Sequence, residues 1–314
     1  MPLVIKQTTE DRAELGDVIE FMYDNKIDTS DEESFAEAGE ILAQLANNRE
    51  FLANRAVEEL EDLCVSQEET NTYSAQVMML ATPNEKWSNF FIRANFWPAK
   101  EDHIYKTSGP APFFYHAPHD HNFNFLTVGY HGPGYGSDYY EYEYDEVAGY
   151  TGEKGNLRFV ERSSLHQGKV MLYRAFRDVH DQLPPEQMSI SLNICEHSLR
   201  GQVLDQYAFD TANDRISGII NRNTAVGLMP VAAELCGEEG RELLSEIAQT
   251  HASDRLRACA IRSLASSAAS SQEAHRIIEC SADDVSLLVA GLARHRLERI
   301  AEVEKFRAEL AAGA

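Results

Sequence analysis

The sequence has few basic residues and no long apolar run. It contains 28 Lys and Arg against 51 Asp and Glu, which gives a formal net charge of −23. Nucleic acids and anionic membranes attract concentrated Lys and Arg, so we expect neither as a partner. No stretch approaches the roughly 18–20 apolar residues of a membrane span. The first residues also lack the basic and then apolar pattern of a secretion signal, and we therefore expect a cytoplasmic protein.

Several sequence signatures of other protein classes are missing. The five cysteines are scattered and odd in number, which fits neither a disulfide framework nor a zinc finger. There is no Gly-x-Ser-x-Gly motif for a nucleophilic serine. The glycine-rich segment 132–136 lacks the Lys-Ser/Thr of a phosphate-binding loop. What remains is a globular chain of 314 residues, 43% hydrophobic, which is long enough to bury a substantial core.

Hydrophobic periodicity divides the chain into three regions. Residues 1–70 have helical spacing, in three helices, of which the second begins with a capping box formed by Ser30 and Glu33. In residues 71–212, apolar and polar residues alternate in short segments separated by turns. In residues 213–314, the apolar residues return to helical spacing. The expected strands are 73–81, 87–97, 123–130, 138–146, 156–162, 169–177, 187–195 and 203–209. Short strands at this spacing predict an all-β barrel or sandwich, so the fold class is α+β with helices on both sides of the barrel in the sequence.

The C-terminal region is rich in Ala and Leu. Residues 243–264 resemble one helical pair of the HEAT type, whereas a stable solenoid needs about three repeats. An ordinary helical bundle packed beside the barrel is the alternative. A homo-oligomer or a protein partner is expected to bind through these helices.

The histidines are concentrated in one segment. In Pro118-His119-Asp120-His121, the two histidines are two residues apart, so in an extended strand both side chains point to the same face. Phe123 and Phe125 continue that parity and indicate an apolar face, where an unpaired imidazole is unfavourable. Imidazole is a good ligand for iron, copper, nickel and zinc. The pattern therefore predicts two ligands of one metal ion.

A third histidine follows a later strand. His180 shares the parity of Val170, Leu172 and Phe176, which we expect to face the interior. The predicted metal ligands are His119, His121 and His180.

These segments resemble the cupin superfamily, whose β-barrels carry a His-x-His pair and a third histidine some fifty to sixty residues later. Pro118–His121 with Phe125 and Leu126 is similar to the first cupin motif, in its form in thiol dioxygenases such as cysteine dioxygenase. Residues 168–193, which contain His180, are similar to the second. The resemblance covers residues 85–210. It implies a cupin-type barrel, a three-histidine site that binds Fe(II), and dioxygen as a co-substrate.

The sequence also departs from the cupin pattern. Many cupins have a glutamate ligand at the place of Phe125 or Leu126, and the cysteine of animal cysteine dioxygenases is absent there too. Glu141 and Glu143 are the replacement candidates. Burying these acids is more costly than burying the alternating tyrosines, so we expect the acids to face water. Tyr142 and Tyr144 are then the candidates for the pocket wall and for a catalytic role.

An iron site with three neutral ligands favours an anionic substrate, which needs a positive partner. Arg174 shares the predicted inward parity of His180 and is the first candidate for binding a carboxylate, and Arg93 is the second. His116 is a weaker candidate for an acid or base beside the site. The predicted function is an iron-dependent cupin oxygenase that acts on a small, polar, amino-acid-derived thiol or acid. The alternatives are a cupin hydroxylase or lyase without thiol chemistry, and a metal-free module that binds a small molecule or a protein.

Overall fold

The computed structural model of the protein describes residues 2–71, 76–86, 88–221 and 223–312. The chain divides into two compact units. Unit 1 comprises residues 1–144, 156–202 and 208–214, and unit 2 comprises residues 145–155, 203–207 and 215–314. Unit 1 therefore combines the helical region expected at 1–70 with most of the strand region expected at 71–212.

The N-terminal helices are shorter and more numerous than expected. They are α1 (Leu15–Asp24), α2 (Glu32–Glu37), α3 (Gly39–Asn47), α4 (Phe51–Glu61) and α5 (Val65–Thr70). The N-cap of α2 is Asp31, whose carboxylate accepts a hydrogen bond from the Ser34 backbone N–H, so the predicted capping box of Ser30 and Glu33 is wrong. The Ser30 hydroxyl instead donates to the Asp28 carboxylate.

Most strands of unit 1 belong to two sheets. A six-stranded sheet has the order β1-β7-β4-β9-β3-β2, and a three-stranded sheet has the order β6-β5-β8. Their bounds are β1 (Leu3–Ile5), β2 (Val77–Ala81), β3 (Phe90–Trp97), β4 (Phe125–His131), β5 (Gly136–Glu141), β6 (Arg158–Ser164), β7 (Val170–Tyr173), β8 (Asp178–Leu183) and β9 (Ser189–Glu196). A further two-stranded ribbon consists of β10 (Tyr207–Asp210) and β11 (Arg215–Ile219). Between the strands lie the short helices α6 (His103–Ser108) and α7 (Arg200–Val203) and the single 3-10 turns 111–113 and 144–146.

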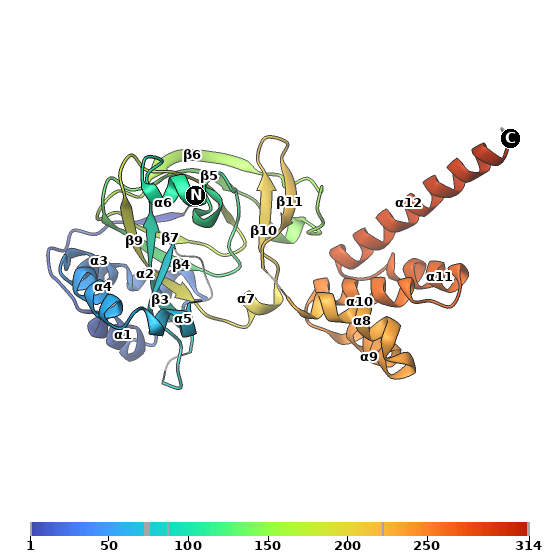
Figure 1. Ribbon diagram of the computed structural model, residues 1–314, viewed down its shortest axis with the longest axis horizontal. Helices are drawn as coiled ribbons and strands as arrows, with labels where there is room; N and C mark the ends of the chain where they lie inside the picture. The colour runs from blue at the N-terminus through green and yellow to red at the C-terminus, as the bar shows by residue number, and fades with distance from the viewer. Residues whose placement is uncertain (1, 72–75, 87, 222, 313–314) are drawn as a thin grey trace. The chain divides into compact units, whose positions relative to one another are not determined.

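The predicted closed barrel is not found among the described residues. The six-stranded sheet ends at β1 and β2, and neither of these edge strands pairs with the three-stranded sheet. The described strands therefore form open sheets rather than a continuous hydrogen-bonded ring. The fold is nevertheless the expected mixture of helices and sheets, with a helical C-terminal region (Figure 1).

The segment 169–177, which was expected to be one strand, consists of a shorter strand and a turn. β7 ends at Tyr173, and residues 174–177 turn the chain into β8, with Phe176 in the left-handed region at a φ of 61°. The strands β1, β8 and β11 were not expected. Residues 73–75 of the first predicted strand and residue 87 of the second lie outside the described residues.

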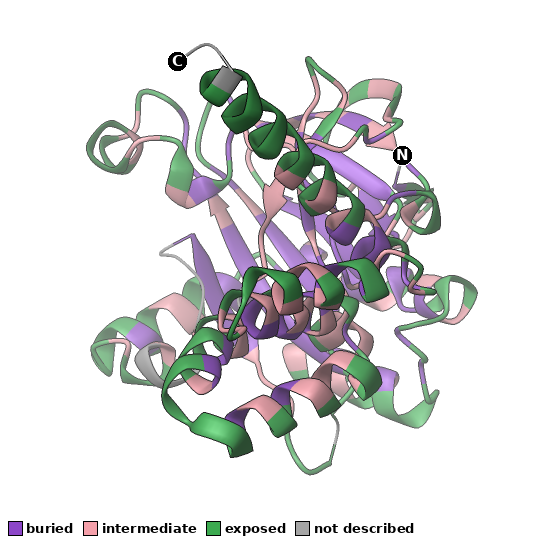
Figure 2. Cartoon of the chain, turned by 90° about the vertical axis from the view of Figure 1, so that its right-hand side faces the viewer, coloured by how far each residue is buried: buried purple, intermediate pink, exposed green. Residues whose placement is uncertain are grey.

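The two faces of the six-stranded sheet pack against different partners. One face, with Leu126, Val128 and Leu172, packs against apolar residues of α1 and α3. The other face, with Phe125 and Tyr173, packs in a cluster that includes Tyr139 of the three-stranded sheet. Figure 2 shows buried residues concentrated on the strands, whereas the outer surfaces of the helices are exposed. The second cluster surrounds the candidate site described below.

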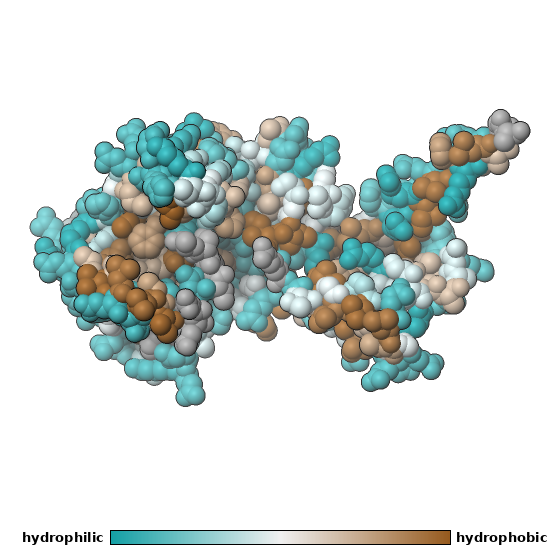
Figure 3. Space-filling model, in the orientation of Figure 1, coloured by the Kyte–Doolittle hydropathy of each residue, from teal (hydrophilic) through white to brown (hydrophobic). Residues whose placement is uncertain are grey.

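Unit 2 is largely helical. Its helices are α8 (Ala225–Leu235), α9 (Gly237–Thr250), α10 (Asp254–Ser266), α11 (Ser271–Ser281) and α12 (Leu287–Ala312). α9 and α10 coincide with the predicted helical pair, and Leu244, Leu256 and Ala260 lie in their common core. Leu228, Val231 and Leu235 of α8 are exposed, and Figure 3 shows apolar surface over this helix. A partner at these helices remains a prediction.

Among the described residues, none of the helices combines the length and the apolarity that crossing a membrane requires.

Candidate metal centre

Backbone pairing brings His119 and His180 directly opposite each other. The His119 N–H donates to the His180 carbonyl at 3.1 Å, and the His180 N–H donates to the His119 carbonyl at 3.0 Å. Two residues that exchange both hydrogen bonds in an antiparallel pair present their side chains on the same face. His121 lies two residues after His119 and joins that face. Ligand atoms of all three imidazoles lie within 4.8 Å of one another.

The imidazoles meet through their Nε2 atoms. The Nε2 atom of His180 lies 3.1 Å from that of His121 and 3.2 Å from that of His119. The Nδ1 atom of His119 lies 2.7 Å from the Ala117 carbonyl oxygen, which can only accept. That contact places the proton on Nδ1 and leaves the Nε2 lone pair of His119 facing the other two rings.

This arrangement fits one metal ion. Histidine nitrogens lie about 2.0–2.1 Å from a bound zinc ion, and two ligands at about that distance can be 3.1–3.2 Å apart. A neutral imidazole carries one N–H proton. Without a cation, the three buried Nε2 atoms would therefore lack enough donors, and some of their lone pairs would stay unsatisfied. The residues present therefore fit a divalent ion held by His119, His121 and His180.

Burial keeps the three imidazoles neutral. Their exposed fractions are 4% for His119, 8% for His121 and 1% for His180. Loss of solvation lowers the pKa of His119 to about 4, although the hydrogen bond to the Ala117 carbonyl opposes this effect. Burial also lowers the pKa of His121 and of His180 well below the usual value. Neutral imidazole is the form that binds metal ions, so the site is prepared for metal at neutral pH.

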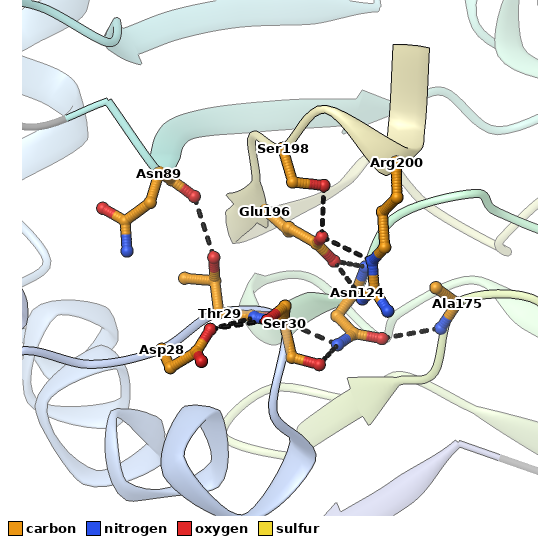
Figure 4. A network of polar contacts seen from close by, with 9 residues as sticks. All are labelled: Asp28, Thr29, Ser30, Asn89, Asn124, Ala175, Glu196, Ser198 and Arg200. Carbon is orange, nitrogen blue, oxygen red and sulfur yellow. Dashed lines mark hydrogen bonds and ion pairs between the residues drawn. The ribbon is translucent and has the colours of Figure 1, made fainter. Parts of the chain in front are cut away.

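A polar network anchors the segment that follows His121. The Asn124 side chain donates to the Thr29 carbonyl at 3.0 Å and accepts from the Ala175 N–H at 2.7 Å. Its backbone N–H donates to the buried Glu196 carboxylate at 2.8 Å. Figure 4 shows Asn124 at the centre of these contacts, with Arg200 bound to Glu196 on the other side. The network fixes the entry to β4 three residues after a ligand.

Arg93 lies on the histidine side of the six-stranded sheet. Its side chain is 7% exposed, and its positive charge contributes to the lowered pKa of both His119 and His121. The guanidinium carbon is 5.9 Å from the centre of the Phe91 ring. A buried cation whose charge acts on His119 and His121 is the feature expected of an anion-binding residue.

Arg174 is placed differently from the prediction. Its guanidinium donates to the Asp178 carboxylate at 2.7 and 3.0 Å and to the Glu141 carboxylate at 2.9 Å. The reason is the turn at 174–177, which interrupts the strand parity on which the prediction depended. Two carboxylates already neutralise this cation. Glu141, which was expected to face water, is largely buried by these contacts, whereas Glu143 is exposed as expected.

The structure does not place Tyr142 and Tyr144 on the face predicted for them. β5 ends at Glu141, so the alternation that we extended to residue 146 stops there. The Tyr142 hydroxyl donates to the Asp120 carboxylate, which lies between the two histidines in sequence and points to the opposite face. Tyr144 packs against Phe176, with ring centres 4.8 Å apart. Their catalytic role stays an untested prediction.

Two other tyrosines contact the site instead. Tyr139 of β5 lies opposite His180 of β8, and the Tyr173 ring centre is 5.0 Å from that of His180. The two hydroxyl oxygens are 3.0 Å apart. Tyr139 directly precedes the tyrosine-rich segment that begins at Tyr140. Its position beside His180 depends on the register between β5 and β8, which the sequence does not show. Exposed His116 is not in the histidine group.

Comparison with known proteins gives no close relative. No family model matches the sequence, and no curated protein matches it. The structures that resemble it include three proteins at 10–13% identity. A cupin-like protein from Thermotoga maritima is 13% identical with a TM-score of 0.22, and the match covers 40% of this chain and 70% of that chain. A salicylate 1,2-dioxygenase variant from Pseudoaminobacter salicylatoxidans is 10% identical with a TM-score of 0.25, and the match covers 46% of this chain and 33% of that chain. A DMSP lyase from Ruegeria pomeroyi is 11% identical with a TM-score of 0.23, and the match covers 46% of this chain and 55% of that chain. The chain thus spans only about half or less of the last two proteins. TM-scores this low do not assign a fold.

Proposed function

We propose that the protein is a cupin-type oxygenase that binds one Fe(II) ion through His119, His121 and His180. The observation that carries this proposal is the convergence of three buried, neutral Nε2 atoms. The resemblance of residues 118–126 and 168–193 to the cupin motifs supports it. Iron held by these three neutral ligands would supply redox chemistry with dioxygen.

The surrounding residues favour a small anionic substrate. Arg93 supplies a buried positive charge on the histidine side that acts on His119 and His121, and it is now the better candidate for the carboxylate partner. The phenols of Tyr139 and Tyr173 offer hydrogen-bond donors beside His180. Aromatic rings of Phe123 and Phe125 pack against His121 and exclude water from that side. An amino-acid-derived thiol or acid fits this positive charge and these hydrogen-bond donors.

Two alternatives differ in their requirement for metal or oxygen. A cupin hydroxylase or lyase without thiol chemistry would use the same three histidines. A metal-free binding or docking module would not need them. Iron content separates the last alternative from the others, and oxygen consumption with candidate thiols and acids separates an oxygenase from a lyase.

The deciding experiment measures bound iron in protein reconstituted anaerobically with Fe(II). Wild-type protein should bind one equivalent, and the variants His119→Ala, His121→Ala and His180→Ala should each lose it while they remain folded, because two ligands hold the ion too weakly. His131→Ala is the matched control, since His131 is exposed at the end of β4. Retention of iron by a His119→Ala/His180→Ala double variant would contradict the assignment.

A further inference from the structure

The aromatic residues on the two faces of the six-stranded sheet are different in kind. On the helix-covered face, Tyr130 is the only tyrosine among the described buried residues of the cluster, which are mainly aliphatic. On the histidine side, the cluster contains four tyrosines and a tryptophan, namely Trp97, Tyr115, Tyr135, Tyr139 and Tyr173. Phenylalanine would fill the same space without a buried polar atom. The oxidisable rings are therefore concentrated around the candidate metal centre.

These rings form a series that begins beside His180, a ligand of the proposed metal ion. The ring centre of Tyr173 lies 5.0 Å from that of His180. The Tyr173 hydroxyl is hydrogen-bonded to that of Tyr139, and Tyr135 belongs to the same buried cluster, where it contributes to the raised pKa of Tyr173. The ring of Tyr135 packs against that of Trp97, with their centres 3.9 Å apart.

The series continues to a partly exposed residue. Trp97 lies 6.0 Å from Tyr115, and Tyr115 lies 5.9 Å from Tyr105, measured between ring centres. Tyr105 belongs to α6 and is only half-buried, whereas the other members are buried. The steps from Tyr135 to Tyr105 are contacts between tyrosine or tryptophan rings, and the step from Tyr173 to Tyr135 joins two tyrosines of one buried cluster.

We propose that Tyr173, Tyr135, Trp97, Tyr115 and Tyr105 form an electron-transfer path that carries oxidising equivalents from the histidine site to the protein surface. This inference rests on the proposed iron site and adds a protective function to it. When an oxidant forms at the site without substrate to consume it, the path directs the damage away from the ligands. Buried imidazoles and the nearby Met171 would otherwise be the first groups oxidised.

The chemistry balances with hydrogen peroxide as the oxidant. One peroxide molecule takes one electron from Fe(II) and one electron from a phenol, takes two protons, and becomes two water molecules. The phenol O–H bond breaks and supplies one of the two protons, and solvent supplies the second proton. The other products are Fe(III) and a tyrosyl radical. Electrons then move inward from Tyr105 until the radical lies at the surface. A small thiol in solution restores the Tyr105 phenol by giving up a hydrogen atom, and two such thiols end as a disulfide.

Hydrogen bonds hold the phenol and indole groups of the path in place. The Tyr173 and Tyr139 hydroxyls are in contact, so a proton can pass between two phenol oxygens. Tyr115 donates to the Pro98 carbonyl at 2.9 Å, and the Trp97 indole N–H donates to the Ser191 hydroxyl at 3.0 Å.

The test treats anaerobic iron-loaded protein with one equivalent of hydrogen peroxide in the presence of a nitroso spin trap. Radicals are detected by electron paramagnetic resonance, and the trapped residues are located by mass spectrometry. In wild-type protein we expect adducts on Tyr105. In Trp97→Phe, which retains a smaller aromatic ring, the Tyr105 adduct should fall to the level of metal-free protein, and oxidation of the histidine ligands and Tyr173 should rise.

Two further variants control for unfolding and for non-specific oxidation. Tyr105→Phe removes only the surface end, so the adduct should be lost and oxidation of the histidine ligands should rise, because the remaining members of the path are buried. Tyr130→Phe, on the opposite face of the sheet, should leave the Tyr105 adduct unchanged. An equal Tyr105 adduct in Trp97→Phe and wild type, both with full iron content, would overturn the path and leave the metal site intact. A wild-type protein that binds no iron would overturn both.

Discussion

Two arginines of unit 1 are about equally buried but have different neighbours. Arg93 and Arg174 are 7% and 8% exposed. Arg174 is enclosed by the carboxylates of Asp178 and Glu141, whose side chains are 0% and 12% exposed. A buried ion pair of this kind is structural, because removing one partner leaves the other charge buried and uncompensated. Arg93 lies instead where its charge acts on the two histidines of the His-x-His pair.

Replacement of Arg174 should therefore affect stability rather than substrate binding. In Arg174→Met we expect the free energy of unfolding of unit 1 to fall by about 3–5 kcal/mol, since the fully buried Asp178 loses its ion-pair partner, whereas Glu141 keeps Arg158 and Arg177. Urea denaturation measures the change. The matched control is Arg162→Met, whose ion pair with Asp138 involves a side chain that is 66% exposed, and which should change the stability far less. An Arg174→Met protein with wild-type stability and a raised KM would restore Arg174 as the substrate-binding residue.

The secondary-structure elements explain why the sequence predicts the ligands better than their surroundings. His119 and His121 lie in one extended segment, so period-two reasoning within that segment suffices. The relation between Arg174 and His180 crosses a turn, and the relation between Tyr139 and His180 depends on strand register. Parity carries no information across a turn or between strands. For the same reason Met171 and Tyr173, rather than Val170 and Leu172, face the histidine side.

Local sequence patterns also could not predict that the sheets are open rather than closed into a barrel. Short segments of alternating polarity predict strands, but they do not show which edge strands of a sheet pair with each other. The edge strand β1 lies at the N-terminus, in a region that periodicity assigned to helices, and it pairs with β7 in the register of Leu3 with Leu172. Strand existence was therefore predictable for most of residues 77–210, whereas sheet closure was not.

The loop network around Asn124 provides a test at the level of elements. Its side chain connects the loop before α2, the start of β4 and the turn after β7 through Thr29 and Ala175. Asn124→Ala should lower the unfolding free energy of unit 1 by about 1–3 kcal/mol, because a buried backbone N–H and a carbonyl lose their partner. It should also weaken Fe(II) binding, since the segment that carries His121 loses its anchor.

Urea denaturation and equilibrium dialysis against Fe(II) measure these two effects. Asn25→Ala is the control, because the Asn25 side chain donates to the Phe21 carbonyl in an exposed position at the end of α1. Unchanged iron affinity in Asn124→Ala, at reduced stability, would show that the ligand segment holds its geometry without this network.

At the scale of the whole molecule, the ligands and the C-terminal helices belong to different units. His119, His121 and His180 all lie in unit 1, whereas α8–α12 lie in unit 2. A ligand that binds only the folded state stabilises the unit that holds its site. Binding of Fe(II) should therefore raise the stability of unit 1 and leave the stability of unit 2 unchanged.

Hydrogen exchange resolved by peptide can separate the two responses. At a free Fe(II) concentration about 100 times Kd, unit 1 should gain about 2.7 kcal/mol, so its slowest amides, which exchange through unfolding of the unit, should exchange about 100-fold more slowly. Peptides from residues 225–312 should exchange at the same rate with and without iron. The His119→Ala/His180→Ala double variant controls for non-specific effects of the metal and should respond in neither unit. Equal slowing in both units of the wild-type protein would mean that they unfold together, or that unit 2 contributes to the binding of the ion.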